Sequence, residues 1–217
     1  MSILGNNLLA QHYAQNQGLP FGYEAVEYLE STGTQYIDTG VVGSNLINVD
    51  TLVTLKSSSS AYFIFGSRVA FQNKAIALSY IYNDNTCQIG WGNHDFSSII
   101  YNIHINQKTK ISNNAGLFTV IQDDVTQNYD CGFYTFNNNL NIYIFTVNQN
   151  GSPNTQGFIG QLLYFKILDN NELIRNFIPC VRKSDGKPGL YDLCKSICPL
   201  TGTPFYINAG TGEFVTP

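Results

Sequence analysis

The acidic residues of this chain are the side chains that could carry acid–base chemistry. Hydrolysis of a glycosidic bond requires carboxyl groups that face one groove. Glu24, Glu27 and Glu30 are spaced three apart, so they would not all share one face of a strand. Asp123 and Asp124 follow a strand-like run, as residues of an ordinary solvated loop do. These carboxylates therefore do not indicate a hydrolase.

Histidines and nucleophiles give no stronger signal of catalysis. His12, His94 and His104 are too dispersed to suggest a catalytic triad or a metal site. The sequence contains neither a Gly-x-Ser-x-Gly elbow nor a phosphate-binding loop. We expect that the chain is not an enzyme and that it has no catalytic and no metal-ligating residues.

One loop carries the residue types that bind sugars. A sugar ring has an apolar face and a polar rim, so its site needs an aromatic platform beside amide and carboxylate groups. Trp91 is followed closely by Asn93, His94 and Asp95, and Tyr82 could extend the same surface. These five residues are the candidate ligand-binding site. The alternative is that Trp91 fills the core, as a lone tryptophan in a small domain usually does.

Neighbouring loops also carry the residue types that bind calcium. Asp84, Asn85, Asn93 and Asp95 supply the oxygen atoms that Ca²⁺ prefers, in neighbouring loops. The alternative is that the same side chains cap turns. We expect no cofactor, with calcium as the alternative.

The cysteines do not form a disulfide framework by number or spacing. There are five, and an odd, scattered set predicts mostly reduced and buried thiols. Cys194 and Cys198 are four apart, with no histidine after them to complete a zinc site. A bridge between these two across a hairpin is the alternative.

Composition excludes several classes of partner. A net charge of -4 without a basic stripe argues against nucleic acid, and no apolar stretch is long enough to span a membrane. The N-terminus lacks the features of a secretory signal, so release from a cell would need another route, such as lysis. A surface rich in Asn, Thr, Gly and Tyr with only 12% charged residues resembles a protein interface. We expect a homo-oligomer or docking onto a larger assembly.

Residues 1–22 differ from the rest of the chain. Their apolar residues lean to one side of a short helix that is too short to be stable alone, and Gly and Pro end it. One interpretation is a frayed terminus packed on the domain. The other is an attachment arm that orders on a partner through Ile3, Leu4, Leu8 and Leu9.

Residues 23–217 predict one β-domain. Ile47, Val49, Val53 and Leu55 alternate with polar residues, which indicates a half-buried strand. Turn residues recur every 8 to 12 positions, as in a sandwich. We expect further strands at 99–105, 108–111, 117–122, 140–147 and 158–168, a hairpin loop at 112–116, and at 169–175 either a helical turn or a bent strand.

Several segments together resemble a known domain type. They are 28–40 (YLESTGTQYIDTG), 140–147, 157–167, 175–180 (RNFIPC), 189–192 (GLYD) and 205–214 (FYINAGTGEF). They are similar to the concanavalin A-like, or laminin G-like, jelly-roll domains of fibre, tail and head-decoration proteins of phages and prophages of gut bacteria. In that family the two ends of the domain lie together. The segment 194–202 departs from the pattern as a lengthened hairpin.

The resemblance implies a function by binding. It suggests a phage virion structural protein, of the fibre or head-decoration type, that is assembled in the host cytoplasm and released by lysis. Residues 1–22 would attach it to other virion proteins, and the jelly roll would be displayed outward to bind bacterial surface or mucin glycans. The alternative is a carbohydrate-binding lectin or adhesin without a virion role.

Overall fold

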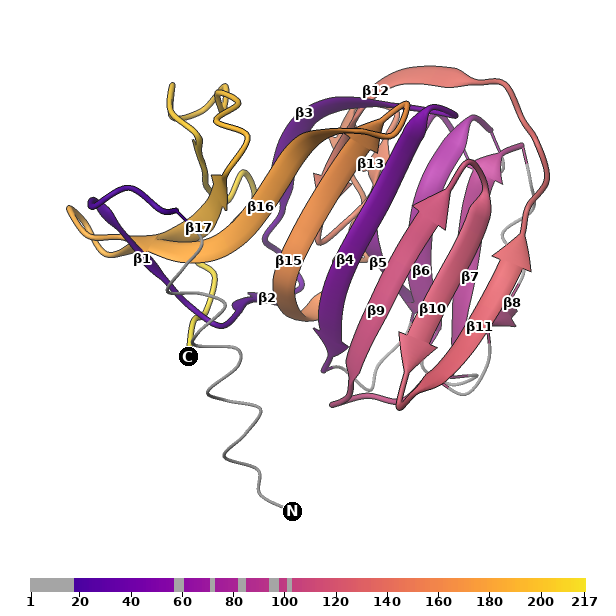
Figure 1. The fold of residues 1–217 in the computed structure, drawn as a ribbon, viewed down its shortest axis with the longest axis horizontal. Coiled ribbons are helices and arrows are strands. Elements are labelled where there is room, and N and C mark those ends of the chain that lie inside the picture. The colour runs from indigo at the N-terminus through magenta and orange to yellow at the C-terminus, as the bar shows by residue number, and fades with distance from the viewer. Residues whose placement is uncertain (1–17, 57–60, 71–72, 82–84, 94–97, 101–102) are drawn as a thin grey trace.

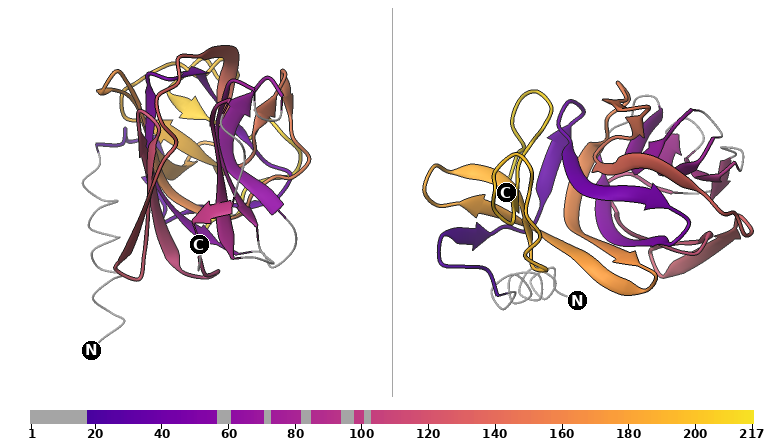
Figure 2. Two further views of the ribbon diagram at one scale, coloured as in Figure 1. Left: turned by 90° about the vertical axis from the view of Figure 1, so that its right-hand side faces the viewer. Right: turned by 90° about the horizontal axis from the view of Figure 1, so that it is seen from above.

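The protein is a two-layered β-structure. The computed structural model describes residues 18–56, 61–70, 73–81, 85–93, 98–100 and 103–217, and these form strands and turns without a helix. Accordingly, no described segment is a helix with the length and hydrophobicity needed to cross a membrane. Two sheets pack face to face (Figures 1 and 2), which confirms the predicted all-β sandwich. Residues 1–17 of the predicted arm lie outside the described residues.

The first sheet is antiparallel throughout and follows the order β11-β10-β9-β4-β15-β16-β17-β18, with β2 beside β15 and β1 beside β16. Its strands are β1 (Tyr23–Ala25), β2 (Leu29–Thr32), β4 (Ile47–Leu55), β9 (Lys108–Asn114), β10 (Leu117–Gln122), β11 (Val125–Asp130), β15 (Ile159–Asp169), β16 (Glu172–Arg182), β17 (Lys187–Asp192) and β18 (Phe205–Tyr206).

The second sheet runs from β3 through β12, β5, β6 and β7 to β8, and a small hairpin of β13 and β14 also joins β5. Its strands are β3 (Ile37–Ser44), β5 (Ala61–Arg68), β6 (Ala75–Ile81), β7 (Thr86–Gly92), β8 (Ser98–Ile100), β12 (Asn137–Ile144), β13 (Asn148–Gln149) and β14 (Ser152–Pro153).

The main core lies between the two sheets. The alternating residues Ile47, Val49, Val53 and Leu55 are all buried there, as their spacing predicts. Aromatic rings join the layers, since Phe65 of β5 meets Phe165 of β15 edge-on at 5.4 Å between centroids. Burial of such side chains supplies about 1.5–3 kcal/mol each, which makes this interface the main source of stability.

A small lobe adjoins the sandwich, where the second half of β16, beyond its pairing with β15, pairs with β17 and β1 (Figures 1 and 2). Its own cluster of buried residues is Ile178, Cys180, Tyr191 and Phe205, with Leu19, Tyr23, Leu193 and Ile207 packed around it. The ring of Tyr23 lies 4.8 Å from that of Tyr191. We call this part the lobe.

The two ends of the domain meet, as the resemblance implies. Glu30 pairs with Val215 across a β-bridge. Thr34 Oγ1 donates to the carbonyl of Thr211, and Gln35 Nε2 donates to that of Glu213. Segments some 180 positions apart in sequence therefore close one structure.

Three local predictions differ from the structure. β9 extends to Asn114, so the hairpin loop expected at 112–116 is a two-residue turn. The strand expected at 99–105 is not continuous, because residues 103–105 are outside any strand. The ambiguous segment 169–175 is strand and turn, because Asn170 and Asn171 adopt positive φ angles and join β15 to β16. Asparagine accepts that conformation more readily than most residues.

The lengthened segment 194–202 is held by a buried carboxylate rather than by a disulfide. Asp192 is fully buried, and its Oδ1 accepts hydrogen bonds from the backbone N–H groups of Asn176 and Cys194. Its Oδ2 accepts from the N–H of Ser196 and lies 3.8 Å from Arg175 Nε. Cys194 is exposed and Cys198 is buried, and both thiols are free.

Candidate functional site

The structure places Trp91 in the core and not in a binding loop. Its side chain is 1% exposed, and its ring meets Phe118 and Phe136 edge-on at 6.0 and 5.2 Å. A ring enclosed in this way offers no face to a sugar, so the predicted stacking platform is corrected to a core residue. Asn93 is exposed beside it, but Tyr82, His94 and Asp95 lie outside the described residues.

The asparagines considered for calcium both bond to protein groups. Asn85 Oδ1 accepts from the Tyr80 hydroxyl at 3.1 Å, and Asn93 Oδ1 accepts from the N–H of Lys74 at 3.2 Å. Asp84 and Asp95 lie outside the described residues. Within the described ranges, no group of three His, Cys, Asp or Glu side chains is arranged to hold a metal ion.

A pair of tyrosines that the sequence did not single out forms the best aromatic surface. Tyr36 directly precedes β3, and Tyr143 lies on β12. Register places Tyr143 opposite Asp38, and Tyr36 shares the strand face of Asp38 because the two are two residues apart. The tyrosine rings therefore stack, with centroids 4.7 Å apart and planes inclined by 26°. Tyr36 is half-buried and supported by the almost buried Tyr143.

Polar groups border this tyrosine pair. Asp38 Oδ1 accepts from the N–H of Gly40 at 2.9 Å, and Asn141 Nδ2 donates to Asp38 Oδ2 at 3.3 Å. Burial, then the Asp38 charge and then Tyr36, raise the pKa of Tyr143 to about 12, and burial and Asp38 raise that of Tyr36. Both phenols thus remain protonated donors at neutral pH.

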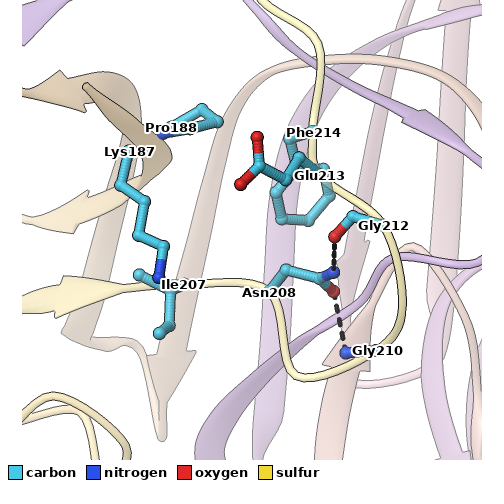
Figure 3. Close-up of a pocket in the computed structure, with 8 residues that line it drawn as sticks. All are labelled: Lys187, Pro188, Ile207, Asn208, Gly210, Gly212, Glu213 and Phe214. Atoms are coloured by element: carbon cyan, nitrogen blue, oxygen red, sulfur yellow. Dashed lines mark hydrogen bonds between the residues drawn. The ribbon is translucent and has the colours of Figure 1, made fainter. Parts of the chain in front are cut away.

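A pocket of about 160 Å³ lies where the chain closes (Figure 3). Exposed Lys187 and Glu213 carry its charges, and the aromatic ring of Phe214 forms an apolar wall that packs on Phe145 in the core. The residues that line it are Lys187, Pro188, Ile207, Asn208, Gly210, Gly212, Glu213 and Phe214.

Asn208 connects this pocket to the tyrosine pair. Its Oδ1 accepts from the N–H groups of Tyr36 and Gly210 at 3.0 and 2.8 Å, and its Nδ2 donates to the carbonyl of Gly212 at 2.8 Å. A Cβ atom at Gly210 would lie 3.1 Å from Tyr36 Cδ1, so the wall of the pocket lies next to the tyrosine ring. Pocket and tyrosines therefore adjoin. We call them together the seam surface, defined by Tyr36, Asp38, Asn141, Tyr143, Lys187 and Glu213.

The sequence contained the parts of this surface but not their assembly. Tyr36 and Asp38 lie within the segment 28–40, and Glu213 lies within 205–214, two of the segments that carry the family resemblance. What joins them is the pairing of distant segments, which no local spacing reports. The implied meeting of the two ends was the signal that could have directed attention here.

Comparison with known proteins identifies the fold. No protein-family model and no curated protein matches this sequence. A protein from Bacteroides ovatus described as carbohydrate-binding has a similar structure, with a TM-score of 0.54 and 12% identity over 88% of this chain and 60% of that one. The chain thus spans about 60% of the length of that relative.

Two further solved structures are similar at lower scores. The CBM40 domain of the Ruminococcus gnavus IT-sialidase, bound to α2,3-sialyllactose, gives a TM-score of 0.48 and 8% identity over 65% of this chain and 88% of its own. A heptameric SAP-like pentraxin from Limulus polyphemus gives 0.42 and 8%, over 68% and 77%.

The first of these likenesses defines the fold class. The chain has the β-sandwich found in a carbohydrate-binding protein, in agreement with the jelly roll expected from sequence. At 12% identity this shows the fold alone, and function has to be argued from the site.

Proposed function

We propose that this chain is a non-catalytic carbohydrate-binding protein and that the seam surface is its glycan site. The observation that carries the proposal is the stacked tyrosine pair beside a carboxylate and an amide. That combination is what a sugar ring requires, because its apolar face stacks on an aromatic ring while its hydroxyls need donors and acceptors.

The geometry suggests how a sugar would be held. Tyr143 is largely buried and fixes the ring of Tyr36, which lowers the entropy that a bound sugar would have to remove. Asp38 and Asn141 would meet sugar hydroxyls at the rim. Lys187 and Glu213 would contact a second unit of the glycan in the adjoining pocket.

A binding role fits these carboxylates better than hydrolysis does. Glycoside hydrolysis uses two carboxyl groups that flank one bond, one of them acting as an acid. On the seam surface, Asp38 is already bonded to Gly40 and Asn141, while Glu213 is exposed in the pocket beyond the loop of Asn208. We therefore propose recognition without turnover and without a cofactor.

We further propose that the protein acts as a virion structural protein of a phage, of the fibre or head-decoration type. The support is the resemblance carried by segments such as 28–40 and 205–214. Residues 1–22 would attach it to other virion proteins, copies would associate as a homo-oligomer, and lysis would release the particle. Many weak glycan contacts would then add up through avidity. A free lectin or adhesin that uses the same seam surface is the alternative.

A glycan array of bacterial polysaccharides and mucin glycans tests the binding role. For the best ligand, Tyr36→Ala should raise Kd at least about tenfold, equivalent to about 1.4 kcal/mol. The matched control is Tyr164→Ala. Tyr164 is also half-buried and donates to an aspartate, Asp50, but both residues lie on the first sheet, away from the seam surface. The Kd of this variant should equal that of the unaltered protein.

Three outcomes would contradict the proposal. Absence of binding to every glycan would remove the adhesive role, and equal losses in both tyrosine variants would remove the seam surface as the site. Release of new reducing ends from a bound polysaccharide would show that the protein is a hydrolase.

A further inference from the structure

Strand β11 ends the first sheet with a regular, open edge. Its six residues pair with β10 without a bulge, from Gln122↔Val125 to Leu117↔Asp130. In a two-residue hairpin the pair next to the turn is hydrogen-bonded, so Val125 and every second residue bond to β10. The N–H and C=O groups of Thr126, Asn128 and Asp130 therefore point outward. No other backbone group of the described residues bonds to them.

The other sheet edges of the described chain are blunted. β3 has irregular register with β12, Gly40 there has a φ of +67°, and Arg175 Nε donates to the carbonyl of Thr39. β1, β8, β14 and β18 have only two or three residues, β14 ends in Pro153, and β2 is bridged to Val215 at Glu30. Proteins shorten, bend or cover edge strands in these ways to prevent pairing with another chain.

β11 has no bulge, proline or lysine, and β8 of the second sheet lies close to it but pairs only with β7 among the described strands. The sequence of β11, Val-Thr-Gln-Asn-Tyr-Asp, contains no Lys, Arg, Pro or Gly and one acidic residue. Large apolar side chains are exposed near both of its ends, with Val125 at 59% and Phe133 at 81% exposure. An open edge with exposed apolar ends is the surface of an interaction site.

We propose that two copies of this chain pair antiparallel through β11, about a two-fold axis at Asn128. The edge is complementary to itself, because that axis places Asn128 opposite Asn128 and Thr126 opposite Asp130 of the other copy. About six backbone hydrogen bonds result, and no two like charges face each other. Thr119 Oγ1 donates to Asn128 Oδ1, which leaves Asn128 Nδ2 for the other copy.

The exposed apolar residues fit the same arrangement. An antiparallel pair centred on Asn128 directs Val125 of one copy toward the segment that begins at Cys131 of the other. Phe133 follows that segment by two positions, and diagonal neighbours of this kind are within reach of an aromatic ring. Both copies make the contact, so Val125 and Phe133 of each copy would be buried against the other.

Pairing through β11 would leave both glycan sites free. β11 lies at the opposite end of the molecule from the lobe, next to which the chain closes (Figure 1). The dimer would therefore present two seam surfaces at its far ends. The inference gives the homo-oligomer of the proposed function a specific contact, but it does not depend on glycan binding.

Sedimentation of the full chain over a range of concentrations tests the proposal. The unaltered protein should form dimers, whereas Asn128→Lys places two like charges at the axis and should raise the dimer dissociation constant at least about tenfold. Ser112→Lys is the matched control, because Ser112 is a partly exposed residue on the same sheet, on β9, away from the edge. It should dimerise like the unaltered protein.

Hydrogen exchange identifies the contact. As concentration rises, the amides of Thr126, Asn128 and Asp130 should become protected, while those of Val125, Gln127 and Tyr129 should be protected throughout. A protein that remains monomeric would overturn the proposal, as would a dimer in which these three amides still exchange fast.

A second variant and a second readout distinguish loss of the dimer contact from misfolding of the variant. Phe133→Ser alters an exposed side chain and should also weaken the dimer, and an unchanged dimer constant would count against the arrangement. Monovalent glycan binding by Asn128→Lys should be unaltered, so a failed dimer test and a failed glycan test remain distinguishable.

Discussion

Gly116 shows how single residues fix the core around Trp91. Its φ is +95°, and a Cβ atom there would lie 2.6 Å from Trp91 Nε1 and 2.8 Å from the carbonyl oxygen of Gly132. Gly116→Ala should therefore lose about 1 kcal/mol for the backbone and about 1–3 kcal/mol more for overpacking. Gly151→Ala measures the backbone cost alone, because Gly151 has a similar φ of +88° but a Cβ atom there would meet nothing within 4 Å.

Urea unfolding followed by the fluorescence of Trp91, the one tryptophan of the chain, measures both variants. Equal free energies of unfolding in the two would show that contact with the indole does not constrain position 116. The burial of this indole also decides between the two interpretations of Trp91 in favour of a core residue. Trp91 stands in sequence beside polar loop residues, but it is still part of β7 and its ring meets Phe118 of the opposite sheet, so burial and not local composition decides its role.

Among the elements, the segment around Asn208 that closes the chain contributes both to stability and to the position of Tyr36. Asn208 accepts from two backbone N–H groups, and without its side chain these donors would lose their partners. Asn208→Ala should reduce the free energy of unfolding by about 1–3 kcal/mol. It should also weaken glycan binding, because the backbone of Tyr36 is anchored there.

Chemical unfolding and glycan titration of the same sample measure both effects. Asn114→Ala is the control, because Asn114 is exposed at the end of β9, and a surface change of this kind should stay within about 0.5 kcal/mol. If Asn208→Ala were as stable as this control, the closing segment would not depend on that side chain.

An element could be predicted from the sequence where the interactions that form it are local, and not where they join distant segments. The strand at 47–55 was predictable because its period of two is local. The absence of strand at 103–105 was not, because residues such as Ile103 bond to other segments, here through a carbonyl that accepts from the Tyr80 hydroxyl. The seam surface was missed for the same reason, since the stack of Tyr36 on Tyr143 joins residues more than 100 positions apart.

At the scale of the whole molecule, the lobe determines how many N-terminal residues can be removed without disturbing the fold. Leu19 packs on the lobe cluster, and the N–H of Lys183 donates to the carbonyl of Gly22. A deletion that is meant to spare the folded part should therefore remove residues 1–17 only. Leu19 and Gly22, which bind the lobe, are kept in this deletion, so we expect the truncated chain to keep its unfolding midpoint and its glycan affinity.

Deletion of residues 1–17 separates the two proposed settings of the protein. A virion protein that attaches through this arm should lose incorporation into phage particles, measured by mass spectrometry of purified particles. Replacement of Ile3, Leu4, Leu8 and Leu9 by serine should have the same effect at full length, because it removes the apolar side chains that would be buried on a partner. Incorporation at the normal level in both variants would exclude the arm as the attachment. Absence of the unaltered, full-length protein from purified particles, together with full glycan binding by the free chain, would favour the lectin.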